Sequence, residues 1–220
     1  MKDYRNLDQK ILGLRREYHW GKLEEKSLDP DPFKQFVRWF EDALRAKVKN
    51  LNSMTLATSS RKAVPSARTV LLKGFDRNSF VFFSNYESRK GKDLALNPNA
   101  VLVFYWPELE RQVCVSGRVT KVSRQESLEY FNSRPFEARI AAWGSQQSQP
   151  IKSRELLEQK CRTLAHQFNR KSVPMPDNWG GFRLKPRSIE FWQGRKNRLN
   201  DRFKYQVTAR NRWKITRLQP

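Results

Sequence analysis

The chain has 220 residues, of which 38% are hydrophobic, and it contains 7 Trp and 14 Phe. This is enough apolar volume for a packed core and excludes an intrinsically disordered chain. Lys and Arg number 44 against 22 Asp and Glu, so the formal net charge is +22. Such a charge favours anionic partners, whether nucleic acid, an acidic membrane surface or small phosphorylated molecules, unless the basic surface is simply solvated.

Membrane insertion and secretion are not expected from the sequence. No apolar run reaches transmembrane length, and the N-terminal MKDYRNLDQK lacks the apolar core of a signal peptide. We therefore expect a cytoplasmic protein in which Cys114 and Cys161 are thiols rather than a disulfide. His19 and His166 have no second ligand type nearby at metal spacing, so no metal site is expected.

The N-terminal part of the chain predicts an arm and then a helix. Residues 1–30 are polar with scattered apolar positions, which indicates a short helix plus an arm ahead of a single domain over 31–220. Asp31 as N-cap and Pro32 at the first helical position predict the start of a helix. Its apolar stripe would comprise Phe33, Phe36, Val37, Phe40 and Leu44.

From Met54 the pattern changes to strands rich in Val, Phe and Thr. Strands are predicted over 54–58, 67–75, 79–85, 100–106 and 111–122, with a tight hairpin connection at 76–78. Helices are predicted over 88–96, 123–133 and 151–169, and strands return after 179. Mostly antiparallel hairpins with inserted helices indicate an α+β protein, an antiparallel β-barrel with peripheral helices.

The common phosphate-binding and nucleophile motifs are missing from the sequence. There is no GxGxxG or GxxxxGK[ST] loop, and no GxSxG elbow or supported Ser-His-Asp set. If the chain is an enzyme, a bound cofactor is therefore expected to carry the chemistry.

Two short segments could hold a phosphate. Ser88, Arg89 and Lys90 stand at a predicted helix start, where free backbone N–H groups favour anions. Arg68 and Lys73 bracket an otherwise apolar strand, and a buried cation needs an anionic partner. Strand alternation puts these two on opposite faces, so either the strand bends or only one points into a site. The first pattern is equally typical of a capped helix whose cations are solvated. The second is equally typical of a strand whose Arg68 and Lys73 side chains reach solvent.

Two further clusters combine cations with aromatic residues. Tyr130 and Arg134 are four apart on a predicted helix and share a face, where they could grip a phosphate or form an ordinary surface pair. Residues 183–217 hold twelve Lys or Arg and two acidic residues, with Trp192 and Trp213 among them. Such a segment suits nucleic acid, a flat aromatic cofactor and its phosphate, or solvent alone.

The order of these motifs along the chain is more specific than any one of them. The ordered set is LRREY (14–18), RTVLLK (68–73), FSN (83–85), SRK (88–90), ERQV (110–113), YFNSRP (130–135), AWGSQQS (142–148), WGGFRL (179–184), IEFWQG (189–194) and RLNDRF (198–203). This set resembles the pyridoxamine 5′-phosphate oxidase family over roughly residues 12 to 218. The resemblance implies an FMN-binding split-barrel fold and a homodimer with FMN at the subunit interface.

The resemblance also implies an activity and the residues that serve it. The implied reaction oxidises pyridoxine 5′-phosphate and pyridoxamine 5′-phosphate to pyridoxal 5′-phosphate, with O2 as acceptor and H2O2, plus ammonia from the amine, as by-products. The FMN contacts carried over by position are Arg68, Thr69, Val70, Leu71, Leu72, Lys73, Phe83, Ser84, Arg89, Lys90, Gln112, Gln147, Ser148, Trp192 and Arg202. The implied substrate contacts are Arg15, Arg16, Glu17, Tyr18, Lys73, Tyr130, Arg134, Ala138, Arg198, Leu199 and Asn200, with Arg198 and Asn200 in catalytic positions.

Two positions depart from the family pattern. Asn200 stands where the family usually has His, and Ala138 stands where a Ser commonly helps to bind the substrate phosphate. Asn can donate a hydrogen bond but cannot carry a proton near neutral pH. These departures favour an alternative, a catalytically weakened protein that binds FMN or pyridoxal phosphate. A nucleic-acid-binding module is a further alternative. Two observations argue against it: the basic residues are spread through the chain, and no nucleic-acid motif appears.

Overall fold

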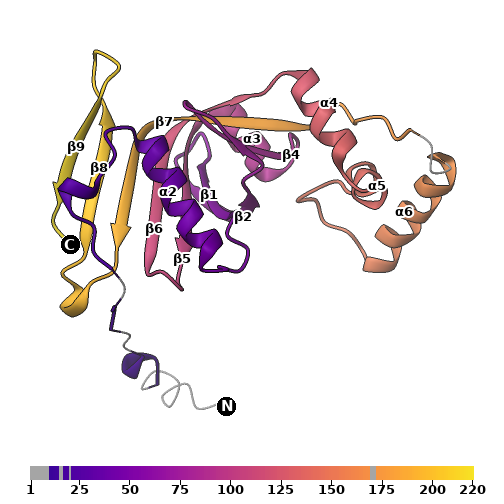
Figure 1. Cartoon of the computed structure of the whole chain (residues 1–220). Helices are drawn as coiled ribbons and strands as arrows, with labels where there is room; N and C mark the ends of the chain where they lie inside the picture. Colours follow the sequence, from indigo (N-terminus) through magenta and orange to yellow (C-terminus); the bar gives the residue numbers. More distant parts are fainter. Residues whose placement is uncertain (1–9, 15–16, 20, 169–171) are drawn as a thin grey trace. The chain divides into compact units, whose positions relative to one another are not determined.

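The computed structural model describes residues 10–14, 17–19, 21–168 and 172–220. Its elements in chain order are η1 (Glu25–Ser27), α2 (Pro32–Arg45), β1 (Ser53–Ser59), β2 (Pro65–Leu71), β3 (Gly74–Phe75), β4 (Phe80–Asn85), α3 (Arg89–Leu96), β5 (Asn99–Trp106), β6 (Arg111–Lys121), α4 (Arg124–Ser133), α5 (Phe136–Gly144), α6 (Arg154–Phe168), β7 (Trp179–Gln193), η2 (Lys196–Arg198), β8 (Asp201–Val207) and β9 (Trp213–Leu218) (Figure 1). None of the described helices is long and apolar enough to cross a membrane.

The strands form one sheet in the order β2-β1-β5-β6-β7-β4-β3, and β8 pairs with both β7 and β9. The assigned pairs β1–β2, β1–β5, β3–β4, β4–β7 and β8–β9 are all antiparallel. The helices α3, α4, α5 and α6 are inserted between strands along the chain. The expected α+β class with an antiparallel sheet is therefore confirmed.

The chain divides into two compact units, each made of separate stretches of sequence. Unit 1 comprises Met1–Val48, Tyr105–Val113 and Glu190–Pro220, and unit 2 comprises Lys49–Phe104 and Cys114–Ile189. Three strands, β5, β6 and β7, run through both units. The expected division into an arm over 1–30 and one domain over 31–220 stays a prediction.

Unit 1 is built around α2 and an aromatic core. The Asp31 carboxylate accepts a hydrogen bond from the Phe33 amide at 2.9 Å, so the predicted N-cap is confirmed. Trp39 on α2 meets Phe191 edge-on, with ring centroids 5.2 Å apart. The predicted stripe was wrong at Leu44, which is exposed, because Trp39 and Ala43 face the core instead.

Unit 2 has a strand core and a helical satellite. Phe80 and Phe104 pack with ring centroids 6.1 Å apart, and both are fully buried. A second cluster, with Phe131, Ile140 and Trp179 as its largest buried members, lies under α4, α5 and α6. Figure 1 shows α5 next to α6, and the two helices are in contact. This satellite includes α4, which bears Tyr130 and is followed directly by its C-cap residue Arg134.

Candidate active site

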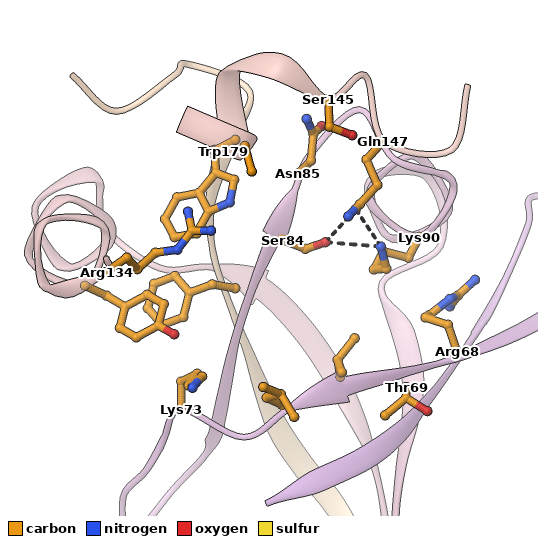
Figure 2. A pocket seen from close by; sticks show the side chains of 16 residues that line it. Arg68, Thr69, Lys73, Ser84, Asn85, Lys90, Arg134, Ser145, Gln147 and Trp179 are labelled. Carbon is orange, nitrogen blue, oxygen red and sulfur yellow. Dashed lines mark hydrogen bonds between the residues drawn. The ribbon is translucent and has the colours of Figure 1, made fainter. Parts of the chain in front are cut away.

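The main cavity of unit 2 has a volume of about 670 Å³ (Figure 2). Every residue that lines it belongs to unit 2. Eleven of the residues predicted from the sequence are among them: Arg68, Thr69, Val70, Leu71, Lys73, Phe83, Ser84, Lys90, Tyr130, Arg134 and Gln147. Segments far apart in the sequence thus bring their cations to one cavity.

One end of the cavity is the start of α3, where Ser88 caps the helix through the Gly91 amide at 3.3 Å. The Lys90 ammonium donates to Ser84 Oγ at 3.1 Å, to Ser88 Oγ at 3.2 Å and to Gln147 Oε1 at 2.9 Å. Among the described residues, the acceptors of Lys90 are therefore all neutral. Burial, and then the charge of Arg68, lower the pKa of Lys90 to about 8.

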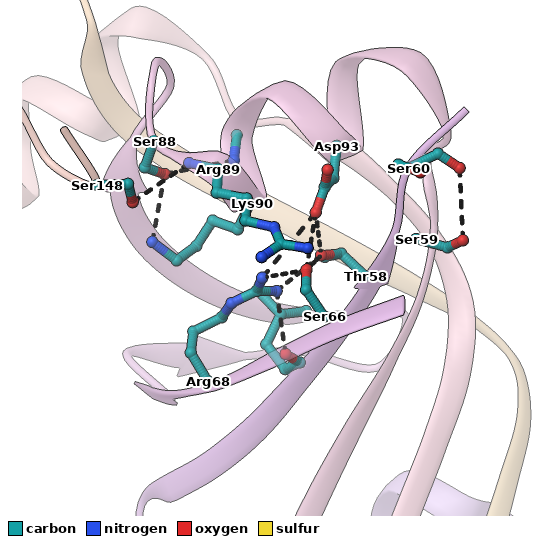
Figure 3. Close-up of polar contacts among 12 residues, drawn as sticks. Thr58, Ser59, Ser60, Ser66, Arg68, Ser88, Arg89, Lys90, Asp93 and Ser148 are labelled. Carbon is teal, nitrogen blue, oxygen red and sulfur yellow. Dashed lines mark hydrogen bonds and ion pairs between the residues drawn. The ribbon is translucent and has the colours of Figure 1, made fainter. Parts of the chain in front are cut away.

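A buried polar network orients Arg68 at the same end (Figure 3). Its guanidinium donates to Thr58 Oγ1 at 2.7 Å and to Ser66 Oγ at 2.6 Å. Both hydroxyls donate in turn to Asp93 Oδ2, at 2.8 and 2.9 Å, and the closest Arg68–Asp93 distance is 3.9 Å. Burial lowers the pKa of Arg68, while Asp93 opposes that shift. Neutral groups thus hold Arg68 in one orientation, and the two hydroxyls connect it to the Asp93 carboxylate, which compensates its charge.

The other end of the cavity combines cations with stacked rings. Tyr130 stacks on Phe83 with centroids 4.0 Å apart, and Trp179 stacks on Phe83 at 5.6 Å. The Arg134 guanidinium lies 4.6 Å from the Trp179 ring, and its Nη1 is buried without a hydrogen-bond partner. Burial lowers the pKa of Arg134, although Tyr130 opposes this shift. A buried guanidinium nitrogen without an acceptor is able to bind an anion.

The strand that carries Arg68 and Lys73 is broken between them. β2 ends at Leu71 and β3 begins at Gly74, so alternation does not continue through Leu72 and Lys73. Arg68 and Lys73 both line the cavity as a result, whereas Leu72 is buried and does not line it. Of the two readings left open by the sequence, the bend is the one observed.

Three further predicted residues belong to unit 2 but do not line the cavity. Arg89 is exposed, and its backbone N–H donates to Ser148 Oγ at 3.3 Å. Ala138 is half-buried on α5. Their contacts with a ligand stay predictions.

The remaining described residues of the prediction belong to unit 1. They are Glu17, Tyr18, Gln112, Trp192, Arg198, Leu199, Asn200 and Arg202, whereas Arg15 and Arg16 lie outside the described residues. Tyr18 meets Trp192 edge-on at 5.5 Å between ring centroids, and Glu17 Oε2 accepts from the Asn197 amide at 3.4 Å. The described part of the expected arm therefore contacts the segment that holds the catalytic candidates.

Those candidates lie in a tight loop at η2. Arg198 and the preceding Asn197 both have positive φ, of 60° and 55°, which is uncommon for residues other than Gly. Asn200 Oδ1 accepts from the Arg195 amide at 3.0 Å, so its side chain helps to close this loop. Arg202 Nε donates to Glu190 at 2.8 Å.

Sequence reasoning missed five lining residues: Asn85, Ala141, Ala142, Ser145 and Trp179. Asn85, Ala142, Ser145 and Trp179 lie inside motifs that carry the resemblance, but no chemistry singled them out. Trp179 is positioned by packing, since it meets Phe131 edge-on at 5.1 Å. A contact that depends on packing of helix against strand leaves no local signal in the sequence.

Solved structures establish the class of protein. A pyridoxamine 5′-phosphate oxidase-related, FMN-binding protein from Nostoc punctiforme has the same fold, with a TM-score of 0.68, 18% identity and 88% of this chain and 99% of that chain covered. PhzG from Burkholderia lata, solved with tetrahydrophenazine-1-carboxylic acid, matches with a TM-score of 0.86, 27% identity and 91% and 99% coverage. The chain therefore has the fold of the FMN-binding split-barrel proteins.

Sequence comparison narrows that class to one family. Residues 40–168 match the family model of pyridoxamine 5′-phosphate oxidase, and residues 179–220 match that of the pyridoxine 5′-phosphate oxidase C-terminal dimerisation region. A pyridoxine/pyridoxamine 5′-phosphate oxidase from Trichormus variabilis is 52% identical, over 97% of this chain and 100% of that protein. Another, from Paraburkholderia phymatum, is 52% identical over 96% and 99%. The chain belongs to the pyridoxamine 5′-phosphate oxidase family and is an oxidoreductase of that family.

Proposed function

We propose that the protein is an FMN-dependent oxidase that converts pyridoxine 5′-phosphate and pyridoxamine 5′-phosphate to pyridoxal 5′-phosphate. Pyridoxine 5′-phosphate and O2 give the aldehyde and H2O2, and the amine substrate also consumes water and releases ammonia. The observation that carries the proposal is a single cavity with a cationic group at each end. Such a cavity suits two phosphorylated ligands that lie against each other.

The residues at the start of α3 fit the phosphate of FMN. Lys90 and Arg68 bring two cations to one place, and the acceptors of Lys90 are uncharged. The free amides of the helix start add to the attraction for an anion. An arriving phosphate would compensate the charge that burial now disfavours. Arg89 and Ser148 are proposed to extend this site at its exposed side.

The opposite end fits the phosphate of the substrate. Arg134 holds a buried nitrogen without an acceptor, and the Lys73 ammonium lies 5.8 Å from the Tyr130 ring centroid. A phosphate bound by Lys73, Tyr130 and Arg134 is remote from the reacting carbon. Its binding energy can therefore be used to orient the pyridine ring.

FMN, when bound, supplies the hydride acceptor for this reaction. The chain's own residues then have three tasks: to anchor both phosphates, to hold the rings in register and to stabilise negative charge with cations. Arg198 is proposed to lie near the reacting carbon, with Leu199 and Asn200 beside it. Gln112 and Gln147 are proposed to hydrogen-bond to bound FMN.

A homodimer completes this proposal. The region 179–220, which matches the C-terminal dimerisation region, contains Trp192, Arg198, Asn200 and Arg202. We propose that FMN binds at the subunit interface, where these residues of unit 1 and Gln112 contribute to the site. Glu17 and Tyr18, with Arg15 and Arg16, are proposed to cover the bound substrate.

The direct test is an oxidase assay on the purified protein loaded with FMN. Pyridoxine 5′-phosphate should yield pyridoxal 5′-phosphate and H2O2 in equal amounts, and Arg198→Gln should reduce turnover while FMN is retained. A protein that holds FMN but makes neither product from either substrate would contradict the proposal. Unchanged turnover in Arg198→Gln would remove Arg198 from the mechanism.

A weakened binder is the second candidate, favoured by Asn200 and Ala138. In this alternative the protein retains FMN or pyridoxal 5′-phosphate but does not turn over. Equilibrium binding of pyridoxal 5′-phosphate without peroxide formation from either substrate would support it. Peroxide formation at a rate proportional to enzyme concentration would exclude it.

A further inference from the structure

Arg183 on β7 binds two elements at once, and neither contact belongs to the proposed ligand sites. Its Nη1 donates to Asp76 Oδ2 at 2.6 Å and to Ser79 Oγ at 2.7 Å. Its Nη2 donates to both carboxylate oxygens of Glu126, at 2.8 and 3.0 Å. The guanidinium thus connects the turn between β3 and β4 to the first turn of α4.

The turn is the segment that fixes Lys73. Asp76 Oδ1 accepts from the Asn78 amide at 2.8 Å and from Ser79 Oγ at 2.9 Å. The Lys73 amide donates to the Val81 carbonyl at 2.9 Å, and Val81 is the register partner of Arg183. Lys73 is therefore connected to Arg183 both through the sheet and through the turn.

Helix α4 carries Tyr130, and Arg134 is its C-cap residue. Glu126, Tyr130 and Arg134 follow one another at intervals of four residues, so they share one face. The charge-assisted contact of Arg183 Nη2 with both Glu126 oxygens holds this face of α4 close to β7. The position of Tyr130 and Arg134 relative to Lys73 then depends on Arg183.

A second, smaller cavity is lined both by Arg183 with its carboxylate partners and by residues of the main cavity. Its volume is about 320 Å³, and Asp76, Glu126 and Arg183 are among the residues that line it. Lys73 and Tyr130 line both this cavity and the main one. The Arg183 network therefore lies directly behind the side chains proposed to hold the substrate phosphate.

We propose that Arg183 is a positioning residue that sets the spacing between Lys73 and the Tyr130–Arg134 face. It acts on the substrate-phosphate end of the cavity and leaves the FMN-phosphate end, built on α3 and β2, unaffected. This inference rests on the proposed function, whose substrate it serves. Its test must therefore include a readout that is independent of oxidase activity.

The kinetic test compares Arg183→Met with Lys185→Met, which removes a cation from the same face of the same strand. Arg183→Met should raise KM for pyridoxine 5′-phosphate and Kd for pyridoxal 5′-phosphate about tenfold, because misplaced binding groups cost one to two powers of ten. Kd for FMN should stay within about twofold, and Lys185→Met should leave all three constants unchanged. Arg183→Lys should recover part of the loss.

Hydrogen exchange provides the readout that does not need turnover. In Arg183→Met, exchange should become faster in β3 and in α4, and should be unchanged in α3. Glu126→Gln removes one half of the network and should show the same pattern more weakly. Unchanged exchange in α4, or equal losses of FMN and substrate affinity, would overturn the proposal. An inactive wild-type enzyme would instead refute the proposed function, while hydrogen exchange would still decide the role of Arg183.

Discussion

Lys90 is, at the scale of one residue, a buried cation in the lining of the main cavity. The residue is 8% exposed, and Ser84, Ser88 and Gln147 provide neutral acceptors for its ammonium. Neutral partners do not compensate a buried charge in full, and burial and Arg68 therefore lower its pKa to about 8. A bound phosphate would provide the missing negative charge.

The first prediction concerns Lys90→Met. A charge-assisted hydrogen bond contributes about 1.5–3 kcal/mol, so Kd for FMN should rise by about 10- to 100-fold. The free protein should be as stable as wild type, or more stable, because an unfavourable buried charge is removed. Flavin fluorescence titration and thermal unfolding without FMN measure the two effects. A strong loss of stability with unchanged FMN affinity would show that Lys90 is structural.

The pH dependence of FMN affinity provides a second prediction. In the free protein Lys90 loses its proton near pH 8, whereas bound phosphate should hold the protonated form. Kd for FMN should therefore be nearly constant from pH 7 to 8 and rise above pH 8, and Lys90→Met should lack this rise. The stability of the free protein changes with pH in the opposite direction to its FMN affinity. The lowered pKa disfavours the folded state below pH 8, and this cost disappears as pH rises from about 8 towards the ordinary value of 10.5.

A third prediction concerns the departure at Asn200. Asn200→His restores a side chain that can carry a proton near neutral pH. We expect kcat or kcat/KM for pyridoxine 5′-phosphate to increase by a fewfold, with FMN content unchanged. Ala138→Ser serves as the comparison, since it reverses the other departure and adds a hydroxyl but no group that carries a proton near neutral pH. Equal rates in Asn200→His and wild type would mean that the departure is harmless.

For single residues, the sequence predicted which side chains pair, but not which strand side chains point to the same cavity. The pairing of Tyr130 with Arg134, and of Ser88 with Lys90, follows from helix spacing and capping. Lys90 donates to Ser88, and Tyr130 and Arg134 line one cavity, while their contacts with a ligand stay predictions. The joint approach of Arg68 and Lys73 to the cavity could not be decided, because strand alternation predicts opposite faces. The break at Leu72, which depends on pairing with other strands, resolves it.

Among the elements, α3 depends most on one small residue. An added Cβ at Gly91 would lie 2.1 Å from the Tyr86 carbonyl oxygen, so the helix start can approach this loop only without a side chain. The capping bond from the Gly91 amide to Ser88 requires the same approach.

The fourth prediction is that Gly91→Ala displaces the start of α3 and Lys90 with it. Overpacking of this kind costs about 1–3 kcal/mol of unfolding free energy, and FMN affinity should fall as well. Gly13→Ala is the matched control, because in the described part of the chain its added Cβ meets no atom within 4 Å beyond its sequence neighbours and its own helix backbone. Wild-type stability and FMN affinity in Gly91→Ala would contradict this account of α3.

Elements with local signals were predicted, and those without them were not. Asp31-Pro32 and Ser88 predicted helix starts correctly, because a cap is a property of neighbouring residues. Helix α5 was missed, since it follows Pro135 directly and has no side-chain cap. β7 is one strand of fifteen residues that continues through Pro186. Helix α6 begins at Arg154 rather than at the expected Ile151.

At the scale of the whole molecule, the cavity accounts for only part of the charge. Arg68, Lys73, Lys90 and Arg134 line it, out of 44 Lys and Arg in the chain.

The proposed dimer predicts a mass of twice 26.2 kDa in solution. Sedimentation equilibrium measures that mass directly. A monomer that binds FMN and turns over normally would contradict a site at the subunit interface.

The central claim is that one cavity holds FMN and a phosphorylated pyridine so that hydride passes between them. The most direct measurement mixes the FMN-loaded protein with pyridoxine 5′-phosphate in the absence of O2 and follows the flavin absorbance. The oxidised flavin band should disappear, pyridoxal 5′-phosphate should form in equal amount, and air should restore the band. A flavin band that persists at saturating substrate would contradict the account.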